Sequence, residues 1–340
     1  MSILKSCILK QCFHFNSCSL KKIILSAIAS VSLIATSVAQ SSNDTTNAPP
    51  AVLTGLYADP HIAAFGKKFY IYPTTDGSVG WNGISFTVWS SNDLQYWSNE
   101  GEVLNVGRDL TWANSRAWAP AIVEKKGTYY FYYSVDGNIG VATGNSPAGP
   151  FKDPLGKALV AKGALPGQMI DPMVFTDDDG SSYLYWGQGN CNVVKLNDDM
   201  ISYDASQIKS FKPIAYNEGT FVFKRNGKYY LMWSENDTRD PRYCVSYATG
   251  DSPMGPFTKS EKGPILKAKG VVRAAGHHSV LQIPGKDEWY IAYHRFKIPG
   301  GNGYNREVCI SPMRFDKEGN ILPVNVFEKV KAVKLRGLLK

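Results

Sequence analysis

The chain has 340 residues, 44% of them hydrophobic and 19% charged, so it can bury a core and is too apolar to be disordered. Aromatic residues make up 12%, and the 31 Gly and 19 Pro residues favour strands and tight turns over helices. The formal net charge of +8 suggests a nucleic-acid or membrane-surface partner, unless that charge lies outside the folded part.

The first 39 residues have the features of a secretory signal peptide. They carry four lysines and no acidic residue, and an apolar run over 23–35 precedes small residues at Ser37 and Ala39. That run is shorter than the roughly 20 residues of a membrane span, although a retained anchor is the alternative. We therefore predict a secreted or periplasmic protein with a signal peptide at 1–39 and no stable membrane insertion after processing.

Removal of this leader lowers the net charge and weakens the case for a polyanionic partner. Four of the 37 basic residues and none of the 29 acidic ones leave with it, so the remaining chain carries about +4. Its basic residues are scattered among acids, which argues against a nucleic-acid partner. The remaining cysteines have no metal-type CxxC spacing and are expected to be buried free thiols; they are Cys191, Cys244 and Cys309. The polar segment 40–51 is expected to be a flexible linker.

From residue 52 onward the sequence repeats loosely every 50–60 residues. Each unit opens with a small or acidic residue and a short apolar strand, then turns into a second strand rich in Tyr and Trp. The five second strands read KFYIYP (68–73), TYYFYY (128–133), SYLYWG (182–187), KYYLMW (228–233) and EWYIAY (288–293). Two units also share a closing phrase, GNSPAGPF (144–151) and GDSPMGPF (250–257).

Five such units without an amphipathic helix between them predict an all-β, five-bladed β-propeller. A small antiparallel sheet cannot bury both faces alone, so blades stack around an axis, with large aromatics packing between them. A β-sandwich is the alternative, but it does not explain five aromatic second strands at regular spacing. We predict a single propeller domain over 52–340, because the chain ends soon after the fifth unit, and we expect a monomer.

The residues that open the units should converge at the centre of a propeller. Asp59, Asp171, Glu218 and His277 open four units at corresponding positions, and Ala119 opens the fifth. Glycoside hydrolysis needs two carboxyl groups, one that protonates the departing oxygen and one that acts on water or on the sugar. A third carboxylate would raise the pKa of the acid by repulsion.

The motifs around these residues resemble glycoside hydrolase family 43. YADPHI (57–62), IDPMVFTDDDG (170–180) and EGTFVFKRNGKYYL (218–231) are similar to its three acidic motifs. WAPAI (118–122) and GHHSV (276–280) are similar to its intervening signatures, and the resemblance covers about residues 52–325.

The resemblance implies a five-bladed propeller and an inverting hydrolase of plant-type polysaccharides. It implies that Asp59 is the general base that activates water and Glu218 the general acid. Asp171 would orient Glu218 and raise its pKa. An inverting enzyme leaves room for a water, so the carboxyls of Asp59 and Glu218 are expected to lie roughly 6.5–9.5 Å apart.

The resemblance also implies several binding residues. His277 matches a histidine that often joins a calcium-centred water network, so a structural calcium is an expectation here, although no cofactor is required for the reaction. Arg306 matches an arginine that reaches the substrate ring. From the sequence itself, Trp118 could stack on the sugar. His61, two residues after Asp59 along a strand, is expected to point the same way and help bind the sugar.

The most specific function consistent with these motifs is an exo-acting α-L-arabinofuranosidase on arabinan or arabinoxylan. β-Xylosidase activity is the alternative within the family, and galactofuranosidase or endo-arabinanase activities follow. A non-catalytic carbohydrate-binding propeller is the alternative from another class, but such a protein would have lost the acids, and all three are present. The motifs specify the chemistry more firmly than the sugar, because loops shape the pocket.

Overall fold

The computed structural model describes residues 48–335. The predicted signal peptide at 1–39 and most of the predicted linker at 40–51 lie outside the described residues. None of the helices found in residues 48–335 has the length and hydropathy of a membrane-spanning segment.

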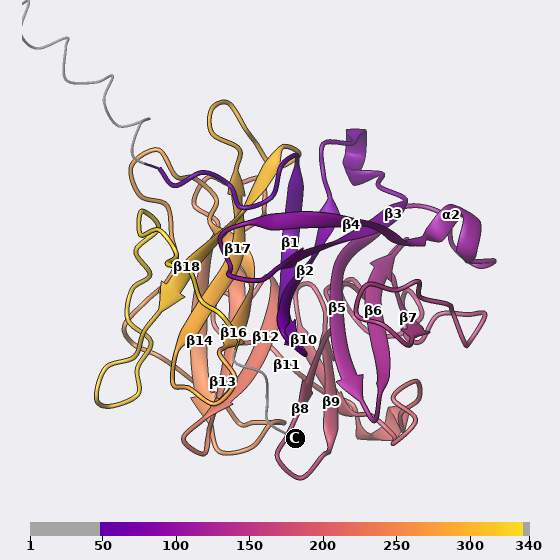
Figure 1. The fold of residues 1–340 in the computed structure, drawn as a ribbon. Helices are drawn as coiled ribbons and strands as arrows, with labels where there is room; N and C mark the ends of the chain where they lie inside the picture. The colour runs from indigo at the N-terminus through magenta and orange to yellow at the C-terminus, as the bar shows by residue number, and fades with distance from the viewer. Residues whose placement is uncertain (1–47, 336–340) are drawn as a thin grey trace, which may run out of the picture. The chain divides into compact units, whose positions relative to one another are not determined.

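The described residues form five antiparallel sheets, which are the five blades of a β-propeller (Figure 1). Blade 1 contains β1 (Tyr57–Phe65), β2 (Lys68–Thr75), β3 (Ser85–Ser91) and β4 (Trp97–Asn105), and blade 2 contains β5 (Trp118–Lys125), β6 (Thr128–Val135) and β7 (Asn138–Gly144). Blade 3 contains β8 (Met173–Thr176), β9 (Ser182–Trp186), β10 (Cys191–Lys195) and β11 (Lys209–Phe211). Blade 4 contains β12 (Glu218–Arg225), β13 (Lys228–Glu235), β14 (Cys244–Gly250) and β15 (Thr258–Lys259), and blade 5 contains β16 (Gly276–Gln282), β17 (Trp289–Phe296) and β18 (Arg306–Met313).

The prediction of a five-bladed propeller is confirmed, and the aromatic second strands explain how the blades pack. Tyr72 of β2 contacts Phe131 of β6 at 5.9 Å between ring centroids, which joins blades 1 and 2. Phe223 of β12 contacts Trp289 of β17 at 5.0 Å, which joins blades 4 and 5. Between strands the helical elements are short, namely η2 (Val79–Trp81), α2 (Val106–Asp109) and η3 (Ala205–Gln207). The three described cysteines are free and buried, as predicted.

The first strands of the blades contact one another in a ring, and β16 of blade 5 returns to β1 of blade 1. In blades 1, 2, 4 and 5 the pairing of the first strand with the second is interrupted by one extra residue, a β-bulge. A residue in the left-handed region lies at each bulge and just before β8; these residues are Asp59 (φ 47°), Ala119 (φ 41°), Asp171 (φ 59°), Gly219 (φ 66°) and His277 (φ 37°).

This register corrects one sequence prediction. Glu218 pairs with Ser234 as Trp118 pairs with Ser134 and Gly276 with His294, so Glu218 precedes the left-handed position. The structural counterpart of Asp59, Asp171 and His277 in blade 4 is therefore Gly219, and the alignment of Glu218 with them was wrong by one residue. The error arose because the carboxyl of Glu218 was matched with those of Asp59 and Asp171, whereas blade 4 has a glycine at their position.

Candidate active site

Hydrogen bonds between neighbouring blades hold the left-handed residues in place. The N–H of Ala119 donates to Thr74 Oγ1 (2.7 Å), that of Asp171 to Ser134 Oγ (2.8 Å) and that of His277 to Ser234 Oγ (2.9 Å). Each acceptor lies on the second strand of the preceding blade. At the fourth interface the N–H of Asp59 donates to His294 Nδ1 of β17 (3.2 Å). The repeat of the fold thus fixes the backbone beneath the site.

The fifth interface departs from this rule, and the departure creates the acidic cluster. Gly187 follows β9 at the place where the other blades carry an acceptor, and it has no side chain. The N–H of Gly219 donates instead to the carboxylate of Asp171 at 3.0 Å. Asp171 is therefore held against the residue that follows Glu218, which brings two carboxyl groups from different blades together.

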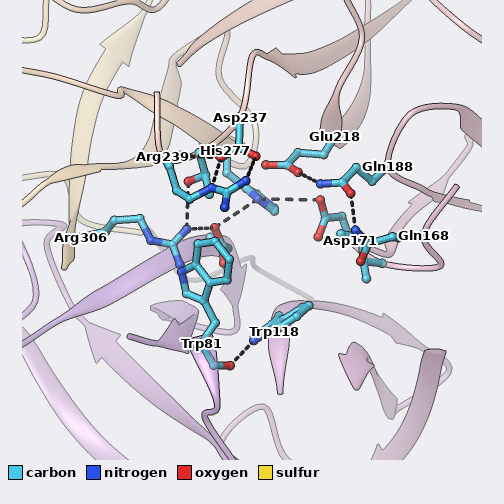
Figure 2. Close-up of a pocket in the computed structure, with 13 residues that line it drawn as sticks. Trp81, Trp118, Gln168, Asp171, Gln188, Glu218, Asp237, Arg239, His277 and Arg306 are labelled. Atoms are coloured by element: carbon cyan, nitrogen blue, oxygen red, sulfur yellow. Dashed lines mark hydrogen bonds and ion pairs between the residues drawn. The ribbon is translucent and has the colours of Figure 1, made fainter. Parts of the chain in front are cut away.

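A pocket of about 210 Å³ opens above these residues (Figure 2). Six residues singled out in the sequence line it: Asp59, Trp118, Asp171, Glu218, His277 and Arg306. Figure 2 shows Glu218 and Asp171 on one side, Arg306 on the other and His277 between them. The structure thus brings all three acidic residues into one cavity from three blades.

Asp59 is surrounded by positive or hydrogen-bonding groups. Its Oδ1 lies 3.1 Å from Arg306 Nη1, 3.2 Å from His277 Nδ1 and 3.0 Å from His294 Nδ1. Burial raises the pKa of this carboxyl, but the charges of Arg306 and His277 and the contact with His294 outweigh burial and hold the pKa well below its usual value. Asp59 is therefore ionised, the state that a general base requires.

Glu218 lies in a different environment. Its Oε1 accepts a hydrogen bond from the Tyr243 hydroxyl (2.7 Å) and its Oε2 accepts one from Gln188 Nε2 (2.6 Å). Burial raises the pKa of Glu218 above its usual value, although His277 and these two hydrogen bonds oppose the increase. Burial, together with repulsion from Glu218 and Asp59, also raises the pKa of Asp171, to about 7. The two carboxyls titrate together, so the pair holds a proton to higher pH than an isolated carboxyl would.

His277 lies among the three carboxyls. Its Nδ1 is 3.2 Å from Asp59 and 4.0 Å from Asp171 Oδ2. Burial lowers the pKa of His277, but attraction by Asp59, Asp171 and Glu218 is stronger, so the pKa is raised above its usual value. A protonated His277 balances part of the negative charge that the cluster concentrates.

Arg306 and Trp118 form part of the pocket wall. Arg306 binds Asp76 through Nε (2.9 Å) and Nη2 (3.2 Å) and contacts Asp59 through Nη1, so most of its donors are engaged by carboxylates. The indole N–H of Trp118 donates to the Trp81 carbonyl oxygen at 2.6 Å. Because its N–H is already bound, Trp118 lines the pocket with apolar ring surface, which suits the C–H groups of a sugar.

His61 is placed differently from the other predicted residues. It does not line the pocket but a neighbouring cavity of about 20 Å³, which shares Asp59, Asp171 and His277 with it. The bulge between Ala58 and His61 breaks the alternation on which its expected orientation depended. The small cavity has room for about one water molecule.

The residues at this position do not fit a dedicated calcium site. Among the described residues, no group of three or more His, Cys, Asp or Glu side chains is arranged to hold a metal. His277 faces two carboxylates, and Asp59 Oδ1 already contacts Arg306 and two histidines, whereas calcium gathers six to eight oxygen ligands.

Several pocket residues were not predicted, because loops supply most of them. They are Gln168, Ile170, Gln188, Asp237, Thr238 and Arg239. Two buried residues that touch the carboxyls, Tyr243 and His294, were also missed. For His294 a signal existed: aligning the second strands places it with Thr74, Ser134 and Ser234. The same alignment also marks Gln188, which directly follows SYLYWG (182–187), whereas for Tyr243 we find no such signal.

Asp171→Asn is predicted to stabilise the protein at alkaline pH. A carboxyl whose pKa is raised by folding contributes full stability below its unfolded pKa and loses that contribution as pH rises through its folded pKa, about 7 here. The amide carries no charge and its oxygen still accepts the Gly219 N–H. We expect a free energy of unfolding higher by about 1–3 kcal/mol at pH 8 and little changed at pH 4. Denaturant unfolding at both pH values checks this; an equal effect at both would contradict it.

Comparison with known proteins agrees with this geometry. The family model described as "Glycosyl hydrolases family 43" matches residues 49–321. A β-D-galactofuranosidase of Aspergillus niger is 38% identical over 296 residues, covering 83% of this chain and 86% of that protein. An arabinoxylan arabinofuranohydrolase of Paenibacillus polymyxa is 33% identical over 333 residues and covers 82% of this chain, which spans about half (51%) of that relative. A solved α-L-arabinofuranosidase of Clostridium thermocellum is 34% identical with a TM-score of 0.69, covering 81% of this chain and 95% of the other.

Proposed function

The chain belongs to family 43 of the glycosyl hydrolases, and on that basis we propose that it is an exo-acting α-L-arabinofuranosidase that removes side chains from arabinan or arabinoxylan. As a member of the family it is an inverting glycoside hydrolase. The proposal adds the sugar, the mode of attack and the roles of individual residues. The leader-like features of residues 1–39 support a secreted enzyme.

In the proposed mechanism Asp59 and Glu218 act on opposite sides of the scissile bond. Ionised Asp59 takes a proton from water, the water oxygen bonds to the anomeric carbon, and the glycosidic C–O bond breaks. Protonated Glu218 gives its proton to the departing oxygen. Arg306 and His277 keep Asp59 ionised, while burial and the neighbouring Asp171 favour the protonated form of the Glu218–Asp171 pair.

The size of the pocket is the observation that supports exo attack most directly. At about 210 Å³ it is smaller than the 300–1,000 Å³ pockets that hold drug-sized ligands, and it suits one sugar unit. Loops close one side of it: Gly77 N–H donates to the Tyr304 carbonyl (2.9 Å) and Trp81 Nε1 to that of Gly303 (2.9 Å). A chain running through the site would need that side open.

β-D-Galactofuranosidase activity is the second candidate, because a relative of that name is 38% identical over most of both chains. α-L-Arabinofuranose and β-D-galactofuranose have the same configuration around the furanose ring. They differ by one additional CHOH group on the exocyclic arm. A pocket for the first sugar must exclude or accommodate that group, so one assay can separate the two activities.

The test is kcat/KM on p-nitrophenyl α-L-arabinofuranoside, β-D-galactofuranoside and β-D-xylopyranoside, measured in parallel. The proposal expects the arabinofuranoside to be the best substrate. A higher value for the galactofuranoside or the xyloside would overturn the assigned sugar while leaving the family assignment intact. A comparison of debranched with branched arabinan then distinguishes removal of side chains from attack within the main chain.

A further inference from the structure

A stacked pair of buried side chains, Tyr243 and His294, lies between the two carboxyls to which we assign the acid and base roles. The two rings are nearly parallel, with 4° between their planes and 5.5 Å between their centroids. Both side chains are completely buried, so neither touches solvent. They come from different blades: His294 from β17 of blade 5, and Tyr243 from the residue before β14 of blade 4.

Each ring binds one of the two carboxyl residues. The Tyr243 hydroxyl donates to Glu218 Oε1 at 2.7 Å. His294 Nδ1 lies 3.2 Å from the Asp59 amide nitrogen and 3.0 Å from Asp59 Oδ1. His294 Nε2 lies 3.2 Å from Thr238 Oγ1. Neutral His294 contacts Asp59 in either tautomer: Nδ1–H can donate to the carboxylate, or unprotonated Nδ1 can accept the amide N–H.

Among the four blades that provide a side-chain acceptor at this position, only blade 5 uses a histidine, His294. The corresponding residues in blades 1, 2 and 4 are Thr74, Ser134 and Ser234, whose hydroxyls are sufficient to accept the N–H of the next blade. A serine would serve that purpose in blade 5 as well. The histidine adds a ring that stacks on Tyr243 and a nitrogen that reaches the Asp59 carboxylate.

Close packing around Tyr243 restricts movement of its ring. A Cβ atom added to Gly276 would lie 2.3 Å from Tyr243 Cδ1, so the backbone of β16 packs directly against the ring on that side. Tyr243 N–H is also bound, to the Asp240 carbonyl at 2.9 Å. The Tyr243 ring is therefore held in one position, and its hydroxyl can hold the Glu218 carboxyl in one position in turn.

We propose that Tyr243 and His294 act together as positioning residues that set the separation and orientation of Glu218 and Asp59 for inversion. An inverting enzyme must keep its two carboxyls far enough apart for one water, roughly 6.5–9.5 Å. Among the described residues no hydrogen bond joins Glu218 to Asp59, and the stack links them through one contact at each end. This inference rests on the proposed roles of Glu218 and Asp59, but not on which sugar is cleaved.

The Tyr243→Phe variant removes the hydroxyl and keeps the stack. We expect kcat to fall about 10- to 100-fold, the loss that one hydrogen bond to a charged group implies, with KM changed less than twofold. The lost bond stabilised ionised Glu218, so the pKa of the acid rises and the basic limb of the kcat/KM profile moves to higher pH. Asp59, Asp171, His277 and Gln188, the other groups facing Glu218, remain in place.

The His294→Ser variant restores the residue type used in other blades. It keeps an acceptor for the Asp59 N–H but loses the stack and the contact with the carboxylate, and kcat should again fall at least tenfold. If its melting temperature shows that it does not fold, His294→Asn takes its place. Because the two residues act as one unit, the double variant should lose clearly less than the product of the two single losses.

Tyr133→Phe is the matched control, because the Tyr133 hydroxyl is buried without a hydrogen-bond partner among the described residues. Its kcat and pH profile should equal those of the wild type. A Tyr243→Phe variant that matches this control, or a double variant whose loss equals the product of the single losses, overturns the proposal. Glu218→Gln, measured alongside, distinguishes failure of the positioning role from failure of the proposed function. If Glu218→Gln is inactive while Tyr243→Phe keeps wild-type activity, the positioning role fails and the proposed function stands.

Discussion

Glu218→Gln is expected to lower kcat/KM on an arabino-oligosaccharide by about 10²- to 10⁴-fold, the usual contribution of one general acid. The amide has the same shape as the carboxyl but has no proton to give. A sugar alkoxide is a poor leaving group, so the departing oxygen requires that proton. With 2,4-dinitrophenyl α-L-arabinofuranoside the leaving group departs without protonation, so the loss should be less than tenfold.

The dependence on the leaving group is the informative part of this prediction. Glu318→Gln, at an exposed position, serves as the control for the same chemical change and should leave both rates unaltered. Steady-state kinetics on the two substrates provide the measurement. An equal loss on both substrates would show that Glu218 does not act as the acid.

Asp59→Asn is expected to lower kcat/KM by about 10²- to 10⁴-fold on both substrates. The base acts on water in the same step whichever group departs, so an activated leaving group does not rescue the variant. Arg306 remains paired with Asp76 through Nε and Nη2, so the substitution does not leave the guanidinium without a carboxylate. The fold should therefore be retained.

Asp198→Asn is the control, because the Asp198 side chain is 99% exposed and does not line the pocket. Kinetics on the oligosaccharide and on the dinitrophenyl glycoside, with a melting temperature for each protein, test the expectation. Rescue of Asp59→Asn by the better leaving group would assign Asp59 to protonation rather than to activation of water.

The repeat of the sequence was sufficient to predict the fold. The aromatic second strands recur because each blade must pack large side chains against its neighbours, and pairs such as Tyr72 with Phe131 show this packing. The convergence of Asp59 and Asp171 follows from the same repeat, since both occupy the left-handed position at the start of the first strand or just before it.

The parts of the site that were missed depend on exceptions to the repeat. Glu218 lies one residue before the position assigned to it, because in blade 4 that left-handed position is occupied by Gly219. Gly187 lacks the acceptor that other blades provide, which allows Asp171 to bind Gly219. His61 is turned away from the pocket by the same kind of bulge.

Loops supply the remaining pocket residues, and their placement depends on contacts between distant segments. Trp81 is held by the Gly303 carbonyl, and Gln188 binds Glu218 from the turn after β9. No pattern of hydrophobicity or spacing records such contacts. The sugar specificity lies in these loops, which explains why the sequence predicts the reaction better than the substrate.

The central claim is that Asp59 activates water opposite a protonated Glu218, so that a single displacement inverts the anomeric centre. Proton NMR of the first product released from p-nitrophenyl α-L-arabinofuranoside, recorded before mutarotation, tests it directly. The mechanism predicts that β-L-arabinofuranose appears first. Initial release of the α anomer would contradict it, because retention requires a carboxylate that attacks the sugar instead of activating water.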